Sequence, residues 1–365
     1  MRETHSGDSR NTTSGVVRLM TYYLVPLLFF YLGVALCVAY GGTSTAVIVT
    51  CALPMVALAV LRGHCGTDTA AYYQAFADLG QGNGYGGEPL FNAYARLLWA
   101  IEPDPRFVVN SVSMTTALLL LWSISRSRHG IWFGGLVLVP GMFYELTMNV
   151  MRFGLAASIF LLATRFSPQR KPLRYFIFAV VGTCVHFSSA LLFLLFVATT
   201  RRGHTIMFVG AALAVAGGSL LVPGYLADKT SLYTGIEAPN ATSGLLFLLI
   251  QLLMLGVMVM HRRQFAIPPV GWMIFAVLVA ALYGMTQVTY AGIRFQLILV
   301  YLMLVVLWRQ FAPPTGRMNT RLAAWLFAIG LIALAGRIHN MSDEEGRGAS
   351  PFLPYRAAPE LQNME

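Results

Sequence analysis

The chain has 365 residues, of which 57% are hydrophobic and only 11% are charged. Soluble domains carry about 25% charged residues, so this composition excludes an ordinary soluble protein and predicts a polytopic membrane protein. The formal net charge is +10, from 25 Lys+Arg against 15 Asp+Glu. In a membrane protein such an excess indicates basic cytoplasmic loops rather than nucleic-acid binding.

Apolar segments close to the roughly 20 residues that cross a bilayer recur along almost the whole chain. We predict an all-α fold with about ten transmembrane helices in one domain over residues 1–341, followed by a flexible polar tail over 342–365. The first segment is too long and too aromatic for a cleaved signal sequence. The predicted spans are 22–40, 44–61, 107–124, 131–148, 150–165, 205–222, 244–260, 270–287, 291–308 and 322–337.

Residues 62–106 separate the second and third spans and are predicted to form an extracytoplasmic loop. Within this loop, the stretch LFNAYARLLWAI at 90–101 has apolar side chains at helical spacing, and Pro89 suits the first turn of a helix. Such a helix is about 18 Å long, too short to cross a bilayer. We therefore predict a helix that lies in the membrane interface.

Residues 175–200 are long enough for one span, but the distribution of positive charge argues against a single crossing. Loop 165–174 is basic and therefore cytoplasmic, so one crossing would place every later basic loop outside. A re-entrant helical hairpin, with its turn near Gly182–Ser189, returns these loops to the cytoplasm. Non-helical backbone at membrane depth needs protein or water around it, which a substrate cavity supplies. The arginines concerned are Arg201, Arg202, Arg262, Arg263, Arg309, Arg317 and Arg321.

Ionisable side chains lie in or beside the apolar segments at Asp68, Glu145, Arg152, His186 and Arg294. A charge at membrane depth is costly, so such residues are candidates for a functional site. With the hairpin topology, all five meet on the extracytoplasmic side. This convergence is the main structural prediction from the sequence.

The stretches that carry these residues resemble, in the same order, the EpsG family of Wzy-type polysaccharide polymerases. The resemblance covers about 62–308, most of the membrane core. Each motif is weak alone, but five in order are fairly specific. They are Arg62 with Gly66-Thr67-Asp68, Tyr72 and Phe76; Glu88-Pro89-Leu90-Phe91; Arg152-Phe153-Gly154-Leu155-Ala156; His186-Phe187-Ser188-Ser189-Ala190; and Ile293-Arg294-Phe295.

The resemblance implies a GT-C-like enzyme of the bacterial inner membrane whose active site faces the periplasm or exterior. Its substrates would be oligosaccharide repeat units on polyprenyl diphosphate, such as undecaprenyl diphosphate. It would join them into an exopolysaccharide or O-antigen chain at the outer leaflet. A flippase and a chain-length regulator of the same pathway would be its partners, and neither a nucleic acid nor a cofactor is implied.

The implied reaction needs positive charge against the leaving diphosphate, and arginine suits this task because it stays protonated and grips phosphate oxygens in pairs. Arg152 and Arg294 are the first candidates, each near the outer end of a span, and Arg62 is the third. The alternative is that an arginine only pairs with a structural carboxylate, for example Arg152 with Glu145.

The base that accepts the proton of the sugar hydroxyl is predicted among His186, Asp68 and Glu145. His186 is equally well a hydrogen-bonded core residue, Asp68 is a good N-cap for the helix that follows it, and Glu145 could instead orient Arg152.

Glu88, Tyr72 and Tyr290 are candidates for binding the acceptor sugars. Interfacial aromatic belts explain the tyrosines as well. Glu88 and Arg62 rank lower than the other charged residues, because the edge of a membrane tolerates charge at small cost.

Other chemistries fit the sequence less well. No D-x-D pair, P-loop or Rossmann glycine pattern is present, so nucleotide-sugar donors and ATP are disfavoured and we predict a metal-independent enzyme. Cys65 near Asp68 matches no standard metal-ligand spacing. The rival functions are a flippase for the same lipid-linked sugars, a glycan ligase, an assembly scaffold and an intramembrane protease.

Overall fold

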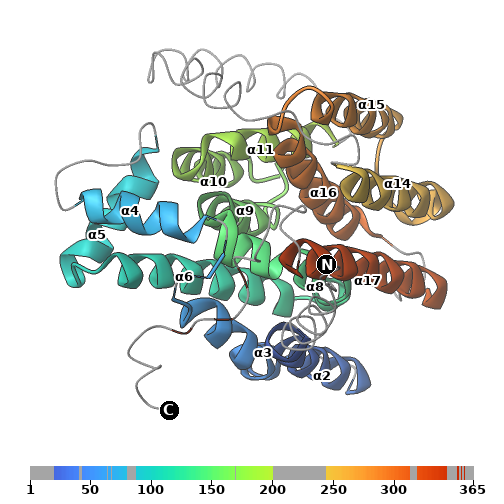
Figure 1. Cartoon of the computed structure of the whole chain (residues 1–365). Coiled ribbons are helices and arrows are strands. Elements are labelled where there is room, and N and C mark those ends of the chain that lie inside the picture. The colour runs from blue at the N-terminus through green and yellow to red at the C-terminus, as the bar shows by residue number, and fades with distance from the viewer. Residues whose placement is uncertain are drawn as a thin grey trace, which may run out of the picture.

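The computed structural model describes residues 20–40, 43–63, 65–66, 68–79, 88–168, 170–199, 244–312 and 319–342, together with Phe352, Tyr355 and Ala357. Every regular element in this part of the chain is a helix (Figure 1). The helices are η1 Met20–Leu24, α2 Val25–Ala39, α3 Thr45–Val60, α4 Thr69–Leu79, α5 Pro89–Ile101, α6 Pro105–Ser125, α7 Arg128–Phe133, η2 Gly134–Leu138, α8 Val139–Tyr144, η3 Glu145–Asn149, α9 Met151–Ala163, α10 Pro172–Val185, η4 Phe187–Ser189, α11 Ala190–Ala198, α14 Leu245–Met260, η5 Arg262–Gln264, α15 Pro269–Thr286, α16 Ala291–Gln310 and α17 Thr320–Ser342.

Six helices in the described residues are long and apolar enough to cross a membrane, and five shorter apolar helices accompany them. The prediction of an all-helical, polytopic membrane protein is therefore confirmed. The count of ten spans and the GT-C-like fold stay predictions. The predicted span 205–222 lies outside the described residues, and the predicted span 150–165 is the 13-residue helix α9, which is short because it begins inside the protein.

Helix α16 is the centre of the bundle, because 83% of the residues in its most apolar 18-residue stretch are buried inside the protein. In the corresponding stretches of α15 and α17 only 22% of the residues are buried, so most of their apolar side chains face outward. A helix that is apolar all round needs apolar neighbours on every side, and these are either other helices or lipid. The bundle therefore has α16 inside, with α15 and α17 on the lipid-facing side (Figure 1).

A sharp reversal at Val150 connects the long helical segment Arg128–Asn149 to α9. The last turn of that segment is the π-helical η3, and α9 then folds back so closely that a Cβ at Gly154 would lie 1.9 Å from the carbonyl oxygen of Leu146. Only glycine fits there. The reversal places the first turn of α9, and with it Arg152, inside the protein.

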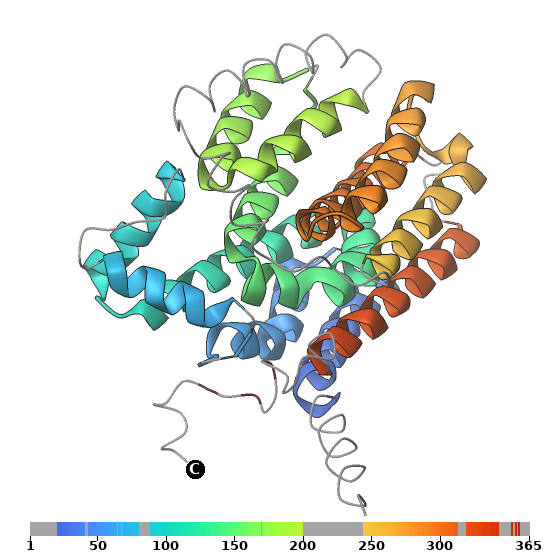
Figure 2. The same ribbon diagram turned by 45° about the horizontal axis from the view of Figure 1, so that its top comes forward.

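Helices α10 and α11 run antiparallel beside each other (Figure 2). The Tyr175 hydroxyl near the start of α10 donates to the carbonyl of Phe193 in α11 at 2.8 Å, and its ring stacks on Phe196. The two helices are separated at His186, whose backbone is extended (φ −156°, ψ 116°). These residues form a helical hairpin with His186 at its tip, and its re-entrant position in the membrane stays a prediction.

Several basic side chains lie together at one end of the bundle. Arg309 at the end of α16 donates to Thr164 Oγ1 after α9 at 2.9 Å, and Arg165 and Arg126 both stack on Trp122 at the end of α6. Helix α9 runs from this end to Arg152, which lies about 20 Å away at 1.5 Å per residue. Arg152 therefore lies well away from the basic end.

Three described residues of the tail pack against the body of the protein. The carbonyl of Phe352 accepts from the Tyr23 hydroxyl at 3.2 Å, the Tyr355 hydroxyl donates to the carbonyl of Leu58 at 2.9 Å, and Ala357 pairs with the backbone of Arg62. This part of the predicted flexible tail is thus held at the end of the bundle opposite the basic residues.

Candidate functional site

Glu88 lies at the centre of a buried polar cluster between α5, α9 and the α10–α11 hairpin. It is the residue before α5, with Pro89 at the first helical position, yet its side chain makes no cap hydrogen bond to that helix. The residue is only 1% exposed. Its carboxylate instead faces side chains from the two other elements. Glu88 was ranked low because the edge of a membrane tolerates charge at small cost, whereas the structure buries this residue inside the protein.

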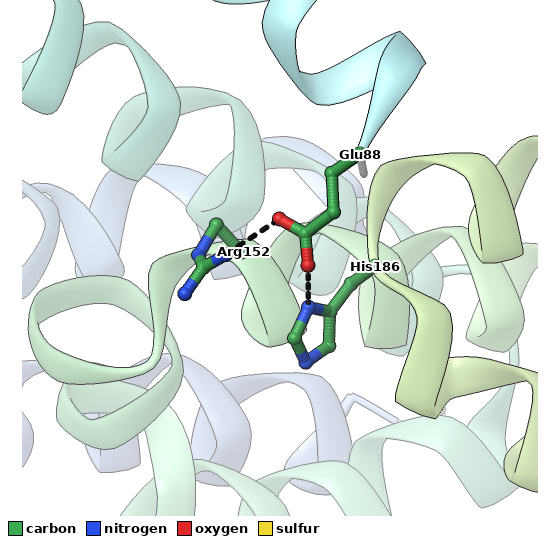
Figure 3. A network of polar contacts seen from close by, with 3 residues as sticks. All are labelled: Glu88, Arg152 and His186. Carbon is green, nitrogen blue, oxygen red and sulfur yellow. Dashed lines mark hydrogen bonds and ion pairs between the residues drawn. The ribbon is translucent and has the colours of Figure 1, made fainter. Parts of the chain in front are cut away.

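Arg152 and His186 both contact this carboxylate (Figure 3). Arg152 Nη1 lies 2.7 Å from Glu88 Oε2, and His186 Nδ1 lies 2.6 Å from Glu88 Oε1. One carboxylate thereby joins residues that are distant in the chain. The far ring nitrogen of His186 points away from Glu88 (Figure 3).

Accessibility differs sharply within the cluster. The Glu88 side chain is 0% exposed, whereas the side chains of Arg152 and His186 are 17% and 19% exposed. Burial by itself raises the pKa of Glu88, but the hydrogen bond with His186 and the charges of His186 and Arg152 outweigh it and hold the pKa below its ordinary value. Glu88 is thus an ionised, enclosed anchor, and the other two groups reach the surroundings.

The protonation of His186 follows from this anchor. An ionised carboxylate can only accept hydrogen bonds, so Nδ1 of His186 must carry the hydrogen that it shares with Glu88. In the neutral imidazole the lone pair then lies on Nε2. The cluster therefore holds an oriented imidazole whose other nitrogen is suited to accept a proton.

Tyr72 and Asp68 extend the cluster from the side of α4. The buried Tyr72 hydroxyl forms a hydrogen bond with Arg152, and burial is the main reason that its pKa is raised. Asp68 precedes α4 and lies close enough to Tyr72 to act on it electrostatically. Residues four apart lie on one face of a helix, which explains this proximity. The predicted candidates Asp68, Tyr72, Glu88, Arg152 and His186 are thus brought together.

Arg294 lies in the first turn of α16 with an exposed side chain. Farther along the same helix, Tyr301 packs edge-on against Phe153, the neighbour of Arg152, and Phe153 packs against His186. Arg294 and Tyr301 are two turns apart and share a face of α16. Arg294 is therefore on the helix face that turns toward the cluster, and Tyr290 immediately precedes this helix.

Arg62 lies apart from the cluster, although it was a candidate for diphosphate binding. Its side chain is 0% exposed. It donates to the carbonyls of Ala59, Thr147 and Met148, and to Ser113 Oγ at 2.9 Å. No carboxylate of the described chain forms an ion pair with it. Arg62 donates hydrogen bonds to carbonyls at the ends of α3 and η3 that have no partner within their own helices, so its role is to stabilise the fold.

We expect the substitution Arg62→Met to destabilise the protein strongly, because each buried carbonyl that loses its donor costs about 1–3 kcal/mol. Thermal unfolding in detergent measures this loss. Arg62→Lys should recover only part of it, since one ammonium cannot reach all four acceptors. Activity per folded molecule should stay close to that of the wild type. A folded but inactive Arg62→Met variant would instead support the predicted diphosphate contact.

Glu145 pairs with a residue that the sequence did not single out. Its Oε2 forms an ion pair with Arg337 of α17 and accepts from Asn149 Nδ2 at 3.2 Å. The suggested pairing of Glu145 with Arg152 is wrong, because the reversal at Val150 turns the two side chains to different neighbours. Arg337 was not singled out from the sequence, although an arginine at the end of an apolar run was a usable signal.

The cluster provides a guanidinium, an oriented imidazole and an enclosed carboxylate, a set that suits an anionic leaving group and a hydroxyl that must lose a proton. Within the described residues, no group of three or more His, Cys, Asp and Glu residues could hold a metal ion. Metal independence stays a prediction.

Comparison with known proteins identifies one family. The sequence model of the EpsG family matches residues 45–357, which include every residue of the cluster. No curated protein and no solved structure matches the chain.

Proposed function

From the premise that this chain belongs to the EpsG family, a Wzy-type polymerase family, we propose that it joins polyprenyl-diphosphate-linked oligosaccharide repeat units into an exopolysaccharide or O-antigen chain. The observation that carries this proposal is the carboxylate of Glu88, which binds Arg152 on one side and His186 on the other. This arrangement couples a phosphate-binding group to a proton acceptor.

His186 is the base in this proposal. Glu88 accepts the Nδ1 hydrogen and so orients the ring, and Nε2 takes the proton from the acceptor hydroxyl. A carboxylate, a histidine and a nucleophilic hydroxyl act together in this way in other enzymes. Glu88 thereby changes from a predicted sugar ligand to a positioning residue, and Asp68 serves through Tyr72 rather than as the base.

Arg152 stabilises the leaving diphosphate. Glu88 and Tyr72 fix the guanidinium before substrate arrives, and preorganised donors lower a barrier most when charge develops in a dry site. Arg294 supplies a second positive charge from the facing helix. Tyr290, beside Arg294, and the exposed edge of α4 are the parts of the site that would contact sugars.

The reaction balances without a metal or a nucleotide. The oxygen of the acceptor hydroxyl forms a bond to the anomeric carbon of the donor sugar, while the bond from that carbon to the diphosphate oxygen breaks. Both bonding electrons leave with the polyprenyl diphosphate, whose added negative charge Arg152 and Arg294 offset. The hydroxyl proton moves to His186.

The site would face the periplasm or exterior of the bacterial inner membrane. This orientation is supported by the separation of Arg152 and His186 from the basic end of the bundle, because clusters of arginine mark the cytoplasmic side. The substrates then reach the site from the outer leaflet, after a flippase has delivered them.

Deleting the gene distinguishes this function from its rivals. Loss of a polymerase leaves single repeat units on lipid carriers at the outer leaflet, and we expect this result. Loss of a flippase traps those units at the inner leaflet, and loss of a ligase accumulates long chains on lipid. Mass spectrometry of extracted lipid-linked glycans, with accessibility tested in intact spheroplasts, separates these outcomes. Either of the last two patterns contradicts the proposal.

A further inference from the structure

The tail residues Phe352, Tyr355 and Ala357, called the tail anchor below, dock on the end of α3 and the loop that follows it. The Tyr355 hydroxyl donates to the carbonyl of Leu58, in the last turn of α3, at 2.9 Å. Ala357 forms an antiparallel pair with the backbone of Arg62, and the guanidinium of Arg62 takes no part in this contact. The tail anchor thus holds the main chain where α3 ends and the loop to α4 begins.

Aromatic packing makes this docking specific. Phe352 is only 2% exposed, and the ring of Tyr23 packs edge-on against Phe352, Tyr355 and Tyr144. The guanidinium of Arg337 lies over the Phe352 ring, 5.8 Å from its centre. Aromatic pairs add stability beyond the burial of their surface. The tail anchor is therefore a fixed part of the fold, and the region that matches the EpsG family includes it.

Cys65 connects the tail anchor to the first turn of α4. Its thiol is fully buried and donates to the carbonyl of Phe352 at 3.5 Å. The carbonyl of Cys65 accepts from the hydroxyl of Thr69, the first residue of α4, at 2.7 Å. One turn farther on, the Tyr73 hydroxyl donates to the carbonyl of Gly63 at 3.3 Å. The loop that the tail anchor holds therefore holds α4 in turn.

Helix α4 carries a side chain that orients Arg152. Tyr72 follows Thr69 by three residues, and its hydroxyl forms a hydrogen bond with Arg152. A helix of 11 residues is marginal by itself, so its packing and the contacts at its ends decide where Tyr72 lies. A chain of direct contacts thus leads from the tail anchor through Cys65 and Thr69 to the guanidinium.

We propose that Phe352 and Tyr355 are positioning residues of the site, which hold the loop between α3 and α4 so that Tyr72 keeps Arg152 oriented toward the leaving diphosphate. This inference rests on the proposed polymerase function. When the tail anchor is released, Glu88 still pairs with Arg152, but the guanidinium loses its hydrogen bond with Tyr72. A donor that must be oriented during the reaction lowers the barrier less than a preorganised one. The loss therefore falls on the chemical step rather than on substrate binding.

Thiol labelling tests whether the tail anchor holds the loop. We expect N-ethylmaleimide to label Cys65 about tenfold faster or more in Phe352→Ala/Tyr355→Ala, the tail variant, because the packing that encloses the thiol is lost. Tyr40→Ala/Phe327→Ala is the matched control, since it removes one tyrosine and one phenylalanine that are both exposed. Mass spectrometry of the labelled peptide distinguishes Cys65 from the other cysteines. A labelling rate that the tail variant leaves unchanged overturns the proposal.

Polymerisation kinetics give the second readout. The tail variant should lower kcat by about ten- to hundredfold with KM little changed, as expected for a lost hydrogen bond to a charged group. Tyr72→Phe should lower kcat by a similar factor. Combining the two should be no slower than Tyr72→Phe alone, because both changes act on one contact. Losses that multiply in the combined variant indicate a merely structural tail and overturn the proposal, as does a wild-type kcat in the tail variant.

Tyr355→Phe is a milder variant that keeps the aromatic packing. It removes only the hydrogen bond to the carbonyl of Leu58. We expect the labelling and kinetic changes of the tail variant at reduced size, and Tyr355→Phe replaces the tail variant if that protein does not fold. In that case an unchanged labelling rate of Cys65 or an unchanged kcat overturns the proposal.

Thermal unfolding makes failure of this proposal distinguishable from failure of the polymerase function. The cycle of the tail variant and Tyr72→Phe, followed by unfolding temperature in detergent, should be non-additive without any turnover. If the wild type forms no polymer while Cys65 labelling and this cycle show the coupling, the positioning role stands and the polymerase is wrong. If the wild type forms polymer and the cycle is additive, the positioning role is wrong and the polymerase stands.

Discussion

Replacing His186 by glutamine should lower the rate of polymerisation by about 10²–10⁴-fold, the usual contribution of a general base. The glutamine amide can still donate a hydrogen bond to the buried carboxylate of Glu88, so the fold keeps its satisfied anchor. It cannot accept a proton at neutral pH. The rate is measured with purified protein and lipid-linked repeat units, with polymer resolved by gel electrophoresis.

His261→Gln is the matched control, because His261 follows α14 at the basic end of the bundle. This variant should polymerise at the wild-type rate. Binding of undecaprenyl diphosphate by His186→Gln should also be retained, since Arg152 remains in place. A wild-type rate in His186→Gln would remove the histidine from the mechanism and leave Asp68 as the remaining candidate base.

Replacing Arg152 by methionine should both abolish polymerisation and destabilise the protein. Breaking a buried ion pair by removing one partner costs about 3–5 kcal/mol, because the other charge stays enclosed. Glu88 is 0% exposed at its side chain and would be that charge. Thermal unfolding and polymer formation are measured on the same preparations.

The double variant Arg152→Met/Glu88→Gln separates the two effects. Removing the carboxylate charge together with the guanidinium should restore most of the lost stability, whereas activity should stay absent because no cation stabilises the diphosphate. Arg126→Met at the exposed, basic end serves as the control for loss of one arginine. Recovery of activity in the double variant would show that Arg152 only neutralises Glu88, and the leaving-group role would be lost.

Much of the candidate site was predictable because the sequence places costly charges in apolar segments. Arg152, His186 and Asp68 were identified on this basis, and they lie together. The hairpin break at His186 was predictable from the charges of loops far from it. The positive-inside rule works across the whole chain, so it constrains topology even where local propensity does not.

Other assignments depended on burial, which a single sequence does not reveal. Glu88 and Arg62 were ranked low as residues at a membrane edge, yet each is almost fully enclosed. Their neighbours differ: Glu88 meets an arginine and a histidine, whereas Arg62 meets backbone carbonyls. One residue therefore belongs to the site and the other supports the fold. Arg337, overlooked in the sequence, became visible only as the partner of Glu145.

The sequence by itself indicated a helical membrane protein of the EpsG family, and it predicted that the unusual charges gather at the end away from the basic loops. Periodicity and charge distribution carry that information because the bilayer penalises every exception. Only the tertiary structure decided which charge pairs with which. Pairing depends on local reversals such as those at Val150 and His186, where a change of a few backbone angles directs a side chain to a different helix.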